Sequence, residues 1–154
     1  MNVYKHVLLA IDFHPIWDKG PINRAMTIAK ECQATLSIVH AVEHVHPYGA
    51  DEPRSVLTEI EATLIDDSKT ELAKIADHLG IATSNQFVKL GQAHEVILET
   101  AQNIQADLII MSNYGGHGIE AVFGSTASAV LHHARCDVLV VRENIPATSK
   151  VTIK

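Results

Sequence analysis

The stretch Val7-Leu8-Leu9-Ala10-Ile11-Asp12 is an unbroken apolar run that ends at an acidic residue. Such a run is too short to cross a membrane as a helix, and it is typical of a strand buried on both faces of a parallel sheet. Similar short runs recur along the chain, and we predict five strands, over residues 5–11, 35–41, 86–90, 107–111 and 137–141.

Segments with helical periodicity separate these strands. The first predicted helix begins near Gly20-Pro21 and ends before Gln33, and Ser55 is the predicted N-cap of the longest helix, which Gly80 ends. A third helix covers residues 95–104, and a fourth follows Gly124. The apolar face of the longest helix is expected to contain Leu57, Ile60, Leu64, Ser68, Leu72, Ile75 and Leu79. Strands that alternate with helices predict an α/β fold with a parallel sheet covered on both faces.

Composition favours one globular domain over residues 1–154, with its core at about residues 4–142 and a tail at 143–154. The chain has 154 residues, is 47% hydrophobic and carries a formal charge of −6. An acidic chain has no general attraction for nucleic acid or anionic lipid, and no stretch resembles a membrane span or a cleaved signal. We therefore predict a cytoplasmic protein. Its two cysteines, Cys32 and Cys136, support neither a zinc ribbon nor a disulfide scaffold.

The loops after the first and fourth strands are the places to look for a ligand, because open parallel sheets bind ligands beyond the carboxyl ends of their strands. The loop after Asp12 contains neither a dinucleotide-binding GxGxxG nor a P-loop. The fourth strand leads into the glycine-rich residues 115–118, and Gly124-Ser125-Thr126 opens the next helix. Glycines and a helix start favour phosphate binding, although Ser125 or Thr126 could equally serve only as a helix cap.

At these residues the chain resembles the universal stress protein (UspA) family, over about residues 4–142. Residues 4–12 are similar to the family's first strand with its terminal Asp12, and residues 124–142 to its final helix and strand. Nucleotide-binding members have the pattern G-x2-G-x9-G-[ST] after the fourth strand. Here Ser112 stands in place of the first glycine, and eight residues separate Gly115 from Gly124.

The resemblance implies a flavodoxin-like, Rossmann-like three-layer sandwich with strand order 3-2-1-4-5 and a bound adenine nucleotide, ATP, with or without Mg²⁺. It implies no catalytic residue and, at most, slow incidental ATP hydrolysis. The implied ligand residues are Ala10, Ile11, Asp12, Ala41, Met111, Ser112, Asn113, Tyr114, Gly115, Gly118, Gly124, Ser125, Thr126 and Ala127. Since residues 104–134 contain no lysine or arginine, phosphate charge must be met by backbone dipoles, hydroxyls, His117 or Mg²⁺.

Three other interpretations bear on function. A nucleotide-free interaction protein of the same fold is the alternative to ATP binding. A metal site would have to use His44 and His46 with Glu43 and Asp51, or the pair His132-His133, and such spacing is weak support, so we predict no metal. A phosphorylated receiver is excluded because Asp12 lacks the neighbouring acid and the later Asp and Lys that such a site requires.

The last strand, Asp137 to Val141, is expected at an edge of the sheet. The family resemblance implies a homodimer formed through this edge; the alternative is that the tail from Glu143 covers the edge within one chain. The remaining partners expected from the sequence are an adenine nucleotide and an unidentified protein.

Overall fold

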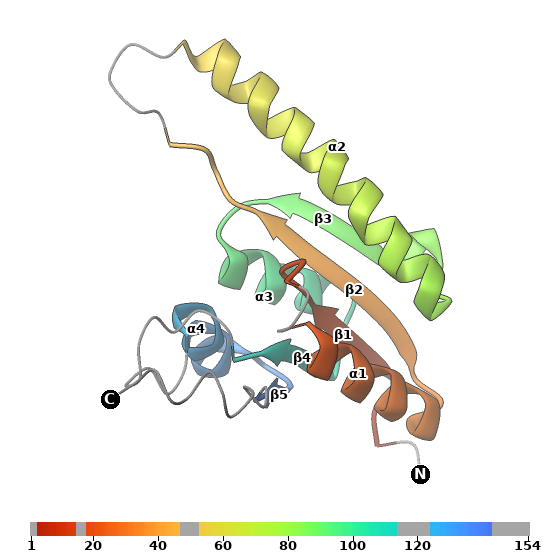
Figure 1. The fold of residues 1–154 in the computed structure, drawn as a ribbon. Coiled ribbons are helices and arrows are strands. Elements are labelled where there is room, and N and C mark those ends of the chain that lie inside the picture. The colour runs from red at the N-terminus through yellow and green to blue at the C-terminus, as the bar shows by residue number, and fades with distance from the viewer. Residues whose placement is uncertain (1–2, 15–17, 47–52, 114–123, 143–154) are drawn as a thin grey trace, which may run out of the picture.

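The computed structural model describes residues 3–14, 18–46, 53–113 and 124–142. Five strands alternate with four α-helices, and one short 3-10 helix precedes the third strand. In chain order the elements are β1 (His6–Ala10), α1 (Lys19–Cys32), β2 (Thr35–Val42), α2 (Arg54–Leu79), η1 (Thr83–Asn85), β3 (Gln86–Leu90), α3 (Ala93–Asn103), β4 (Leu108–Ser112), α4 (Ser125–His133) and β5 (Asp137–Val141) (Figure 1).

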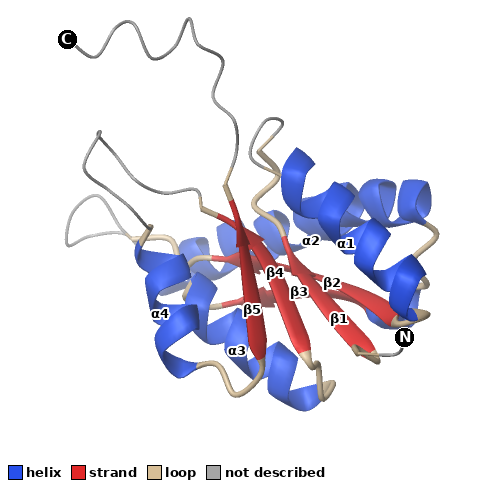
Figure 2. Cartoon of the chain, turned by 90° about the horizontal axis from the view of Figure 1, so that it is seen from below, coloured by secondary structure: helices blue, strands red, loops and turns tan. Residues whose placement is uncertain are grey.

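The five strands form one parallel sheet in the order β3-β2-β1-β4-β5. The predicted fold class and strand order are therefore confirmed. Helices α1 and α2 cover one face of the sheet, and α3 and α4 cover the other (Figure 2). Within the described ranges, no helix is both long enough and apolar enough to span a membrane.

Burial on both faces explains why the central strands are apolar throughout. Alternate residues of β1 enter opposite halves of the core: Val7 and Leu9 pack with α1 and α2, whereas Leu8 packs with α3 and α4. All three side chains are completely buried. A polar side chain in this run would therefore meet a helix whichever face it pointed to.

The sequence-based interpretation of α2 was wrong at two points. Ser55 lies inside the helix, and Pro53 occupies the N-cap position. The expected apolar face is also buried in its C-terminal half alone, since Leu72 is 1% exposed whereas Ile60 and Leu64 are 41% and 39% exposed. Figure 1 shows the reason, because the N-terminal half of α2 extends beyond the end of the sheet and has no strand to cover.

The remaining boundaries agree with the predictions to within about two residues. The largest shift that matters is at α3, which begins at Ala93 rather than at residue 95. As a result, the start of α3 reaches the edge of the sheet where the strands end.

Truncation of two leucines in α2 tests this division of the helix. We expect Leu72→Ala to lower the free energy of unfolding by about 2–5 kcal/mol, because it leaves a cavity in the core. The matched change Leu64→Ala removes the same atoms from an exposed position, and we expect it to cost less than about 1 kcal/mol. Urea denaturation of both variants measures the difference, and similar losses for the two would contradict the observed packing.

Candidate functional site

The carboxyl ends of the inner strands β1, β2 and β4 lie side by side at one end of the sheet. Together with α3 and α4 they surround a narrow cavity of about 20 Å³. That volume holds roughly one water molecule. Seven of the residues predicted to contact a nucleotide line it together: Ala10, Ile11, Asp12, Ala41, Met111, Ser112 and Thr126. Residues from the first, second and fourth strands and from the last helix are therefore brought together at one place.

A wider cavity of about 420 Å³ adjoins the narrow one, and the two share Ala93 and Thr126 as lining residues. The first turns of α3 and α4 both line it, through His94 and Ser125 among others. Helix N-termini carry unpaired N–H groups and a partial positive charge. Two such termini facing one cavity therefore favour an anionic group there.

The start of α4 forms part of the wall of the wider cavity. Gly124 is the N-cap residue, and no side chain in the described part of the chain caps this helix. Ser125 and Thr126 occupy the first helical turn and line the wider cavity, so neither acts as the cap that the sequence left open. Ala127, which the sequence also predicted to contact the nucleotide, is completely buried in the core and does not line either cavity.

The other predicted ligand residues follow β4. The backbone N–H of Asn113 donates to the carbonyl oxygen of Val141 at 3.1 Å, which extends the pairing of β4 with β5 by one residue. Tyr114, Gly115, Gly118 and also His117 lie outside the described residues. Their part in the predicted site stays a prediction.

Asp18 shapes the loop after β1, and the sequence analysis missed this role. Its carboxylate accepts backbone hydrogen bonds from Asp12 at 3.1 Å and from His14 at 2.8 Å, and its side chain is buried. Between them Phe13 adopts a left-handed backbone with φ of 62°, a conformation that costs energy in a residue other than glycine. An acidic residue just before a helix normally indicates an N-cap, so nothing in the local sequence indicates that Asp18 binds the backbone of the preceding loop.

His40 supports the same loop from β2. Its Nδ1 lies 2.8 Å from the carbonyl oxygen of Ile11, and its ring lies against Phe13 with 4.0 Å between ring centroids. A carbonyl oxygen only accepts, so Nδ1 carries the proton. Two side chains, Asp18 and His40, therefore hold the backbone that presents Asp12.

Asp12 stands at the exposed rim of the narrow cavity. Desolvation by the surrounding protein raises its pKa above the usual range, Glu43 adds to this effect, and His40 and His14 oppose it. The Asp12 side chain keeps access to solvent, which moderates the shift. A carboxylate in this position suits a neutral hydrogen-bond donor, such as a sugar hydroxyl, better than a second anion.

The histidines proposed as metal ligands do not form a metal site in the described part of the chain, where no group of three or more His, Cys, Asp or Glu side chains is arranged to hold an ion. His44 instead contacts Glu61 at 3.1 Å, and Glu61 also accepts the backbone N–H of Val45 at 3.0 Å. That backbone hydrogen bond lowers the pKa of Glu61. Asp51 lies outside the described residues.

Comparisons with known proteins agree on one family. The sequence profile of the universal stress protein family matches residues 3–142. Universal stress protein A homolog 2 of Coxiella burnetii is 40% identical over 142 residues, which cover 92% of this chain and 97% of that protein.

Solved structures show the same fold. The universal stress protein UspA from Lactobacillus plantarum superposes with a TM-score of 0.74 at 24% identity, and the match covers 90% of this chain and 98% of that one. A universal stress protein solved in complex with cAMP superposes with a TM-score of 0.60 at 22% identity, over 92% and 98% of the two chains.

The burial of Asp18, whose carboxylate binds the N–H groups of Asp12 and His14, predicts that stability falls as pH rises through its titration. Burial raises the pKa of Asp18 above its usual range despite the hydrogen bonds from Asp12 and His14. The native state therefore holds the Asp18 proton to a higher pH than the unfolded chain does, so stability falls as pH rises through that interval. Asp18→Asn removes this titration.

We expect the free energy of unfolding of the wild type, relative to Asp18→Asn, to fall as pH rises from about 4, near the unfolded pKa of aspartate, through the raised native pKa. Urea denaturation of both proteins at several pH values measures this difference. A difference that stays constant or grows with pH would show that the Asp18 pKa is not raised.

Proposed function

The chain belongs to the universal stress protein family, and we propose that it is a cytoplasmic regulatory protein of the stress response that binds an adenine nucleotide, ATP. The observation that carries the proposal is the junction of two cavities at the carboxyl ends of β1, β2 and β4. Residues suited to an adenosine line the narrow cavity, and the N-termini of α3 and α4 face the wider one.

The two cavities suit different parts of a nucleotide. Apolar side chains of Ala10, Ile11, Ala41 and Met111 line the narrow cavity, and Asp12 stands at its rim. In our proposal these residues frame the adenosine, with the Asp12 carboxylate accepting from a ribose hydroxyl. Because the narrow cavity has room for about one water, side chains must move apart for a base to enter.

The phosphates would occupy the wider cavity. Ser125 and Thr126 supply hydroxyl donors there, next to the N–H groups of the first turn of α4. Among the described residues, neither cavity is lined by lysine or arginine, whereas the wider one is lined by His44, His46 and His94 and by one acidic residue, Glu43. We propose that helix dipoles, these imidazoles and, when present, Mg²⁺ offset the phosphate charge.

We propose regulation by occupancy rather than catalysis. Among the described residues, the Asp12 carboxylate makes no hydrogen bond to a hydroxyl or thiol that it could activate as a nucleophile, so we assign no catalytic residue. A nucleotide can regulate the protein only if it binds two conformations with different affinities.

Two further parts of the proposal concern partners. We propose a homodimer through β5, because β5 is an edge strand whose residues 138–140 are apolar and only half-buried. Because one structural neighbour binds cAMP, cAMP belongs among the ligands to be compared with ATP. A nucleotide-free interaction protein of the same fold is the competing function.

Two serines of α4 provide a matched test. Ser125 lines the wider cavity and Ser128, one turn further along the same helix, does not; both side chains are exposed. We expect Ser125→Ala to weaken ATP binding about tenfold or more, because it removes one hydrogen bond to a charged phosphate. Ser128→Ala should bind ATP as the wild type does.

Calorimetric titration of dialysed protein with ATP and Mg²⁺, with GTP, AMP and cAMP alongside, measures these affinities. Equal affinities of the two variants would place the phosphates elsewhere. Absence of binding heat, together with no nucleotide released from freshly purified and then denatured protein, would favour the nucleotide-free alternative.

A further inference from the structure

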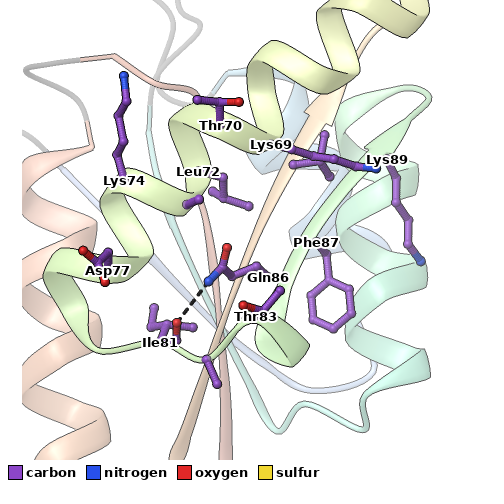
Figure 3. A pocket seen from close by; sticks show the side chains of 13 residues that line it. Lys69, Thr70, Leu72, Lys74, Asp77, Ile81, Thr83, Gln86, Phe87 and Lys89 are labelled. Atoms are coloured by element: carbon purple, nitrogen blue, oxygen red, sulfur yellow. Dashed lines mark hydrogen bonds between the residues drawn. The ribbon is translucent and has the colours of Figure 1, made fainter.

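A groove of about 1010 Å³ runs between α2 and β3, at the opposite edge of the sheet from β5 (Figure 3). Its floor is apolar, since Leu72 of α2 and Ile81, after that helix, both line it and are buried. The side chain of Gln86 donates to the carbonyl oxygen of Ile81 at 3.0 Å and fixes one end of this floor (Figure 3).

The groove follows the open edge of β3. Four consecutive residues of this strand, 86–89, line it, although successive side chains of a strand point to opposite faces. Phe87 packs into one half of the core and Val88 into the other, which confirms the alternation. The shared feature of the four residues is the strand edge itself, so backbone groups form part of the lining.

The free backbone groups of this edge can be identified. In the described part of the chain, β2 is the sole strand paired with β3. The N–H of Gly91 donates to the carbonyl oxygen of Val42 in β2 at 2.9 Å. Because backbone groups alternate in direction along a strand, the N–H and C=O of Val88 and Leu90 point away from β2, towards the groove side.

The rim of the groove is positively charged in a chain whose formal charge is −6. Lys69, Lys74 and Lys89 line it, against a single acidic residue, Asp77. In Figure 3 the side chain of Lys69 extends from α2 towards β3, on the side of the groove where Lys89 lies. Lys74 extends away from the floor and pairs with Glu71 at 3.2 Å, whereas Lys69 reaches towards β3 from α2. Strand alternation places the Lys89 side chain on the face of β3 that Phe87 shares, so Lys69 and Lys89 flank the open edge of β3 from opposite faces of the sheet.

We infer that this groove binds an extended, acidic segment of a partner protein, which adds to the sheet as a strand along β3. The exposed backbone edge supplies hydrogen bonds, the apolar floor accepts alternate side chains, and the lysines select acidic residues. A strand of five residues spans about 17 Å, so about five residues of the partner are recognised.

The same lysines argue against a second copy of this chain as the occupant. Pairing β3 with another β3 would bring Lys89 and Lys69 of both copies together, and lysine on an edge strand opposes such association. An acidic strand removes this repulsion. The inference is independent of nucleotide binding, because none of the residues lining the groove lines either of the two cavities.

The probe is a fluorescent six-residue peptide in which glutamate alternates with valine, compared with the peptide that has lysine in place of glutamate. Fluorescence anisotropy with the full chain measures binding. We expect the acidic peptide to bind and the basic one not to bind. Rising salt should weaken the acidic complex, because exposed charge pairs are screened. Equal binding of the two peptides, or none by the acidic peptide at about millimolar concentration, which corresponds to about 4 kcal/mol of binding free energy, overturns the inference.

Two variants locate the site. The double variant Lys69→Glu/Lys89→Glu should weaken binding of the acidic peptide by about tenfold or more, because both charges change sign. Lys19→Glu/Lys30→Glu makes the same double change on two exposed lysines of α1, outside the groove, and should leave affinity unchanged. An equal loss of peptide affinity in the groove variant and in the control variant would show a general charge effect and would contradict binding in the groove.

Strand addition has its own test, which needs no variant of the protein. N-methylation of alternate backbone nitrogens in the acidic peptide keeps its charge but removes the hydrogen bonds to β3, and we expect binding to be lost. Bound acidic peptide should also slow hydrogen exchange at the N–H of Val88. An N-methylated peptide that binds as tightly as the parent would overturn strand addition even if the double variant failed to fold.

Discussion

The sheet grows from β1 in two opposite directions, first through β2 and later through β4. The candidate site depends on this reversal of strand order. From β1 the sheet grows through β2 to β3, with α1 and α2 on one face, and then through β4 to β5, with α3 and α4 on the other. Right-handed crossovers require the helices to change faces when the direction changes. In open α/β sheets, ligands bind beyond the carboxyl ends of the strands at such a reversal, which here lies between β1 and β4.

The buried strands and the hydrogen-bonded loop after β1 hold the residues of the candidate site in place. Near the ends of β1 and β4, side chains such as Leu9 and Ile110 are completely buried in the core and fix the position of the strands. The loop beyond β1 is held by polar contacts instead. Asp18 binds two N–H groups of that loop and His40 binds a carbonyl, so the loop keeps the left-handed turn at Phe13. Strained backbone held in this way is common at ligand sites. The same sheet has two edge strands of different character: β5 is largely apolar, whereas β3 carries Lys89 beside a groove that Lys69 of α2 also lines.

The fold could be predicted because a strand that is buried on both faces requires apolar residues at consecutive positions. Leu8, Leu9 and Ile109 are completely buried and are all apolar. Most of the narrow cavity could also be predicted, since Asp12, Ala41 and Met111 follow from the family pattern at strand ends. The role of Asp18 could not, because it depends on the path of a loop that local sequence does not determine. The contribution of His94 was missed because helix starts are uncertain by a few residues. The exposure of Leu64 was missed because periodicity cannot show where the sheet ends beneath a helix.

Backbone amide NMR of the labelled protein titrated with ATP tests whether ATP binds where the strand order reverses. Binding there predicts shifts that cluster at the ends of β1, β2 and β4 and in the first turns of α3 and α4, with the amides of Val88 and Leu90 in β3 unchanged. Shifts confined to β3 and α2, or scattered without a cluster, would contradict it.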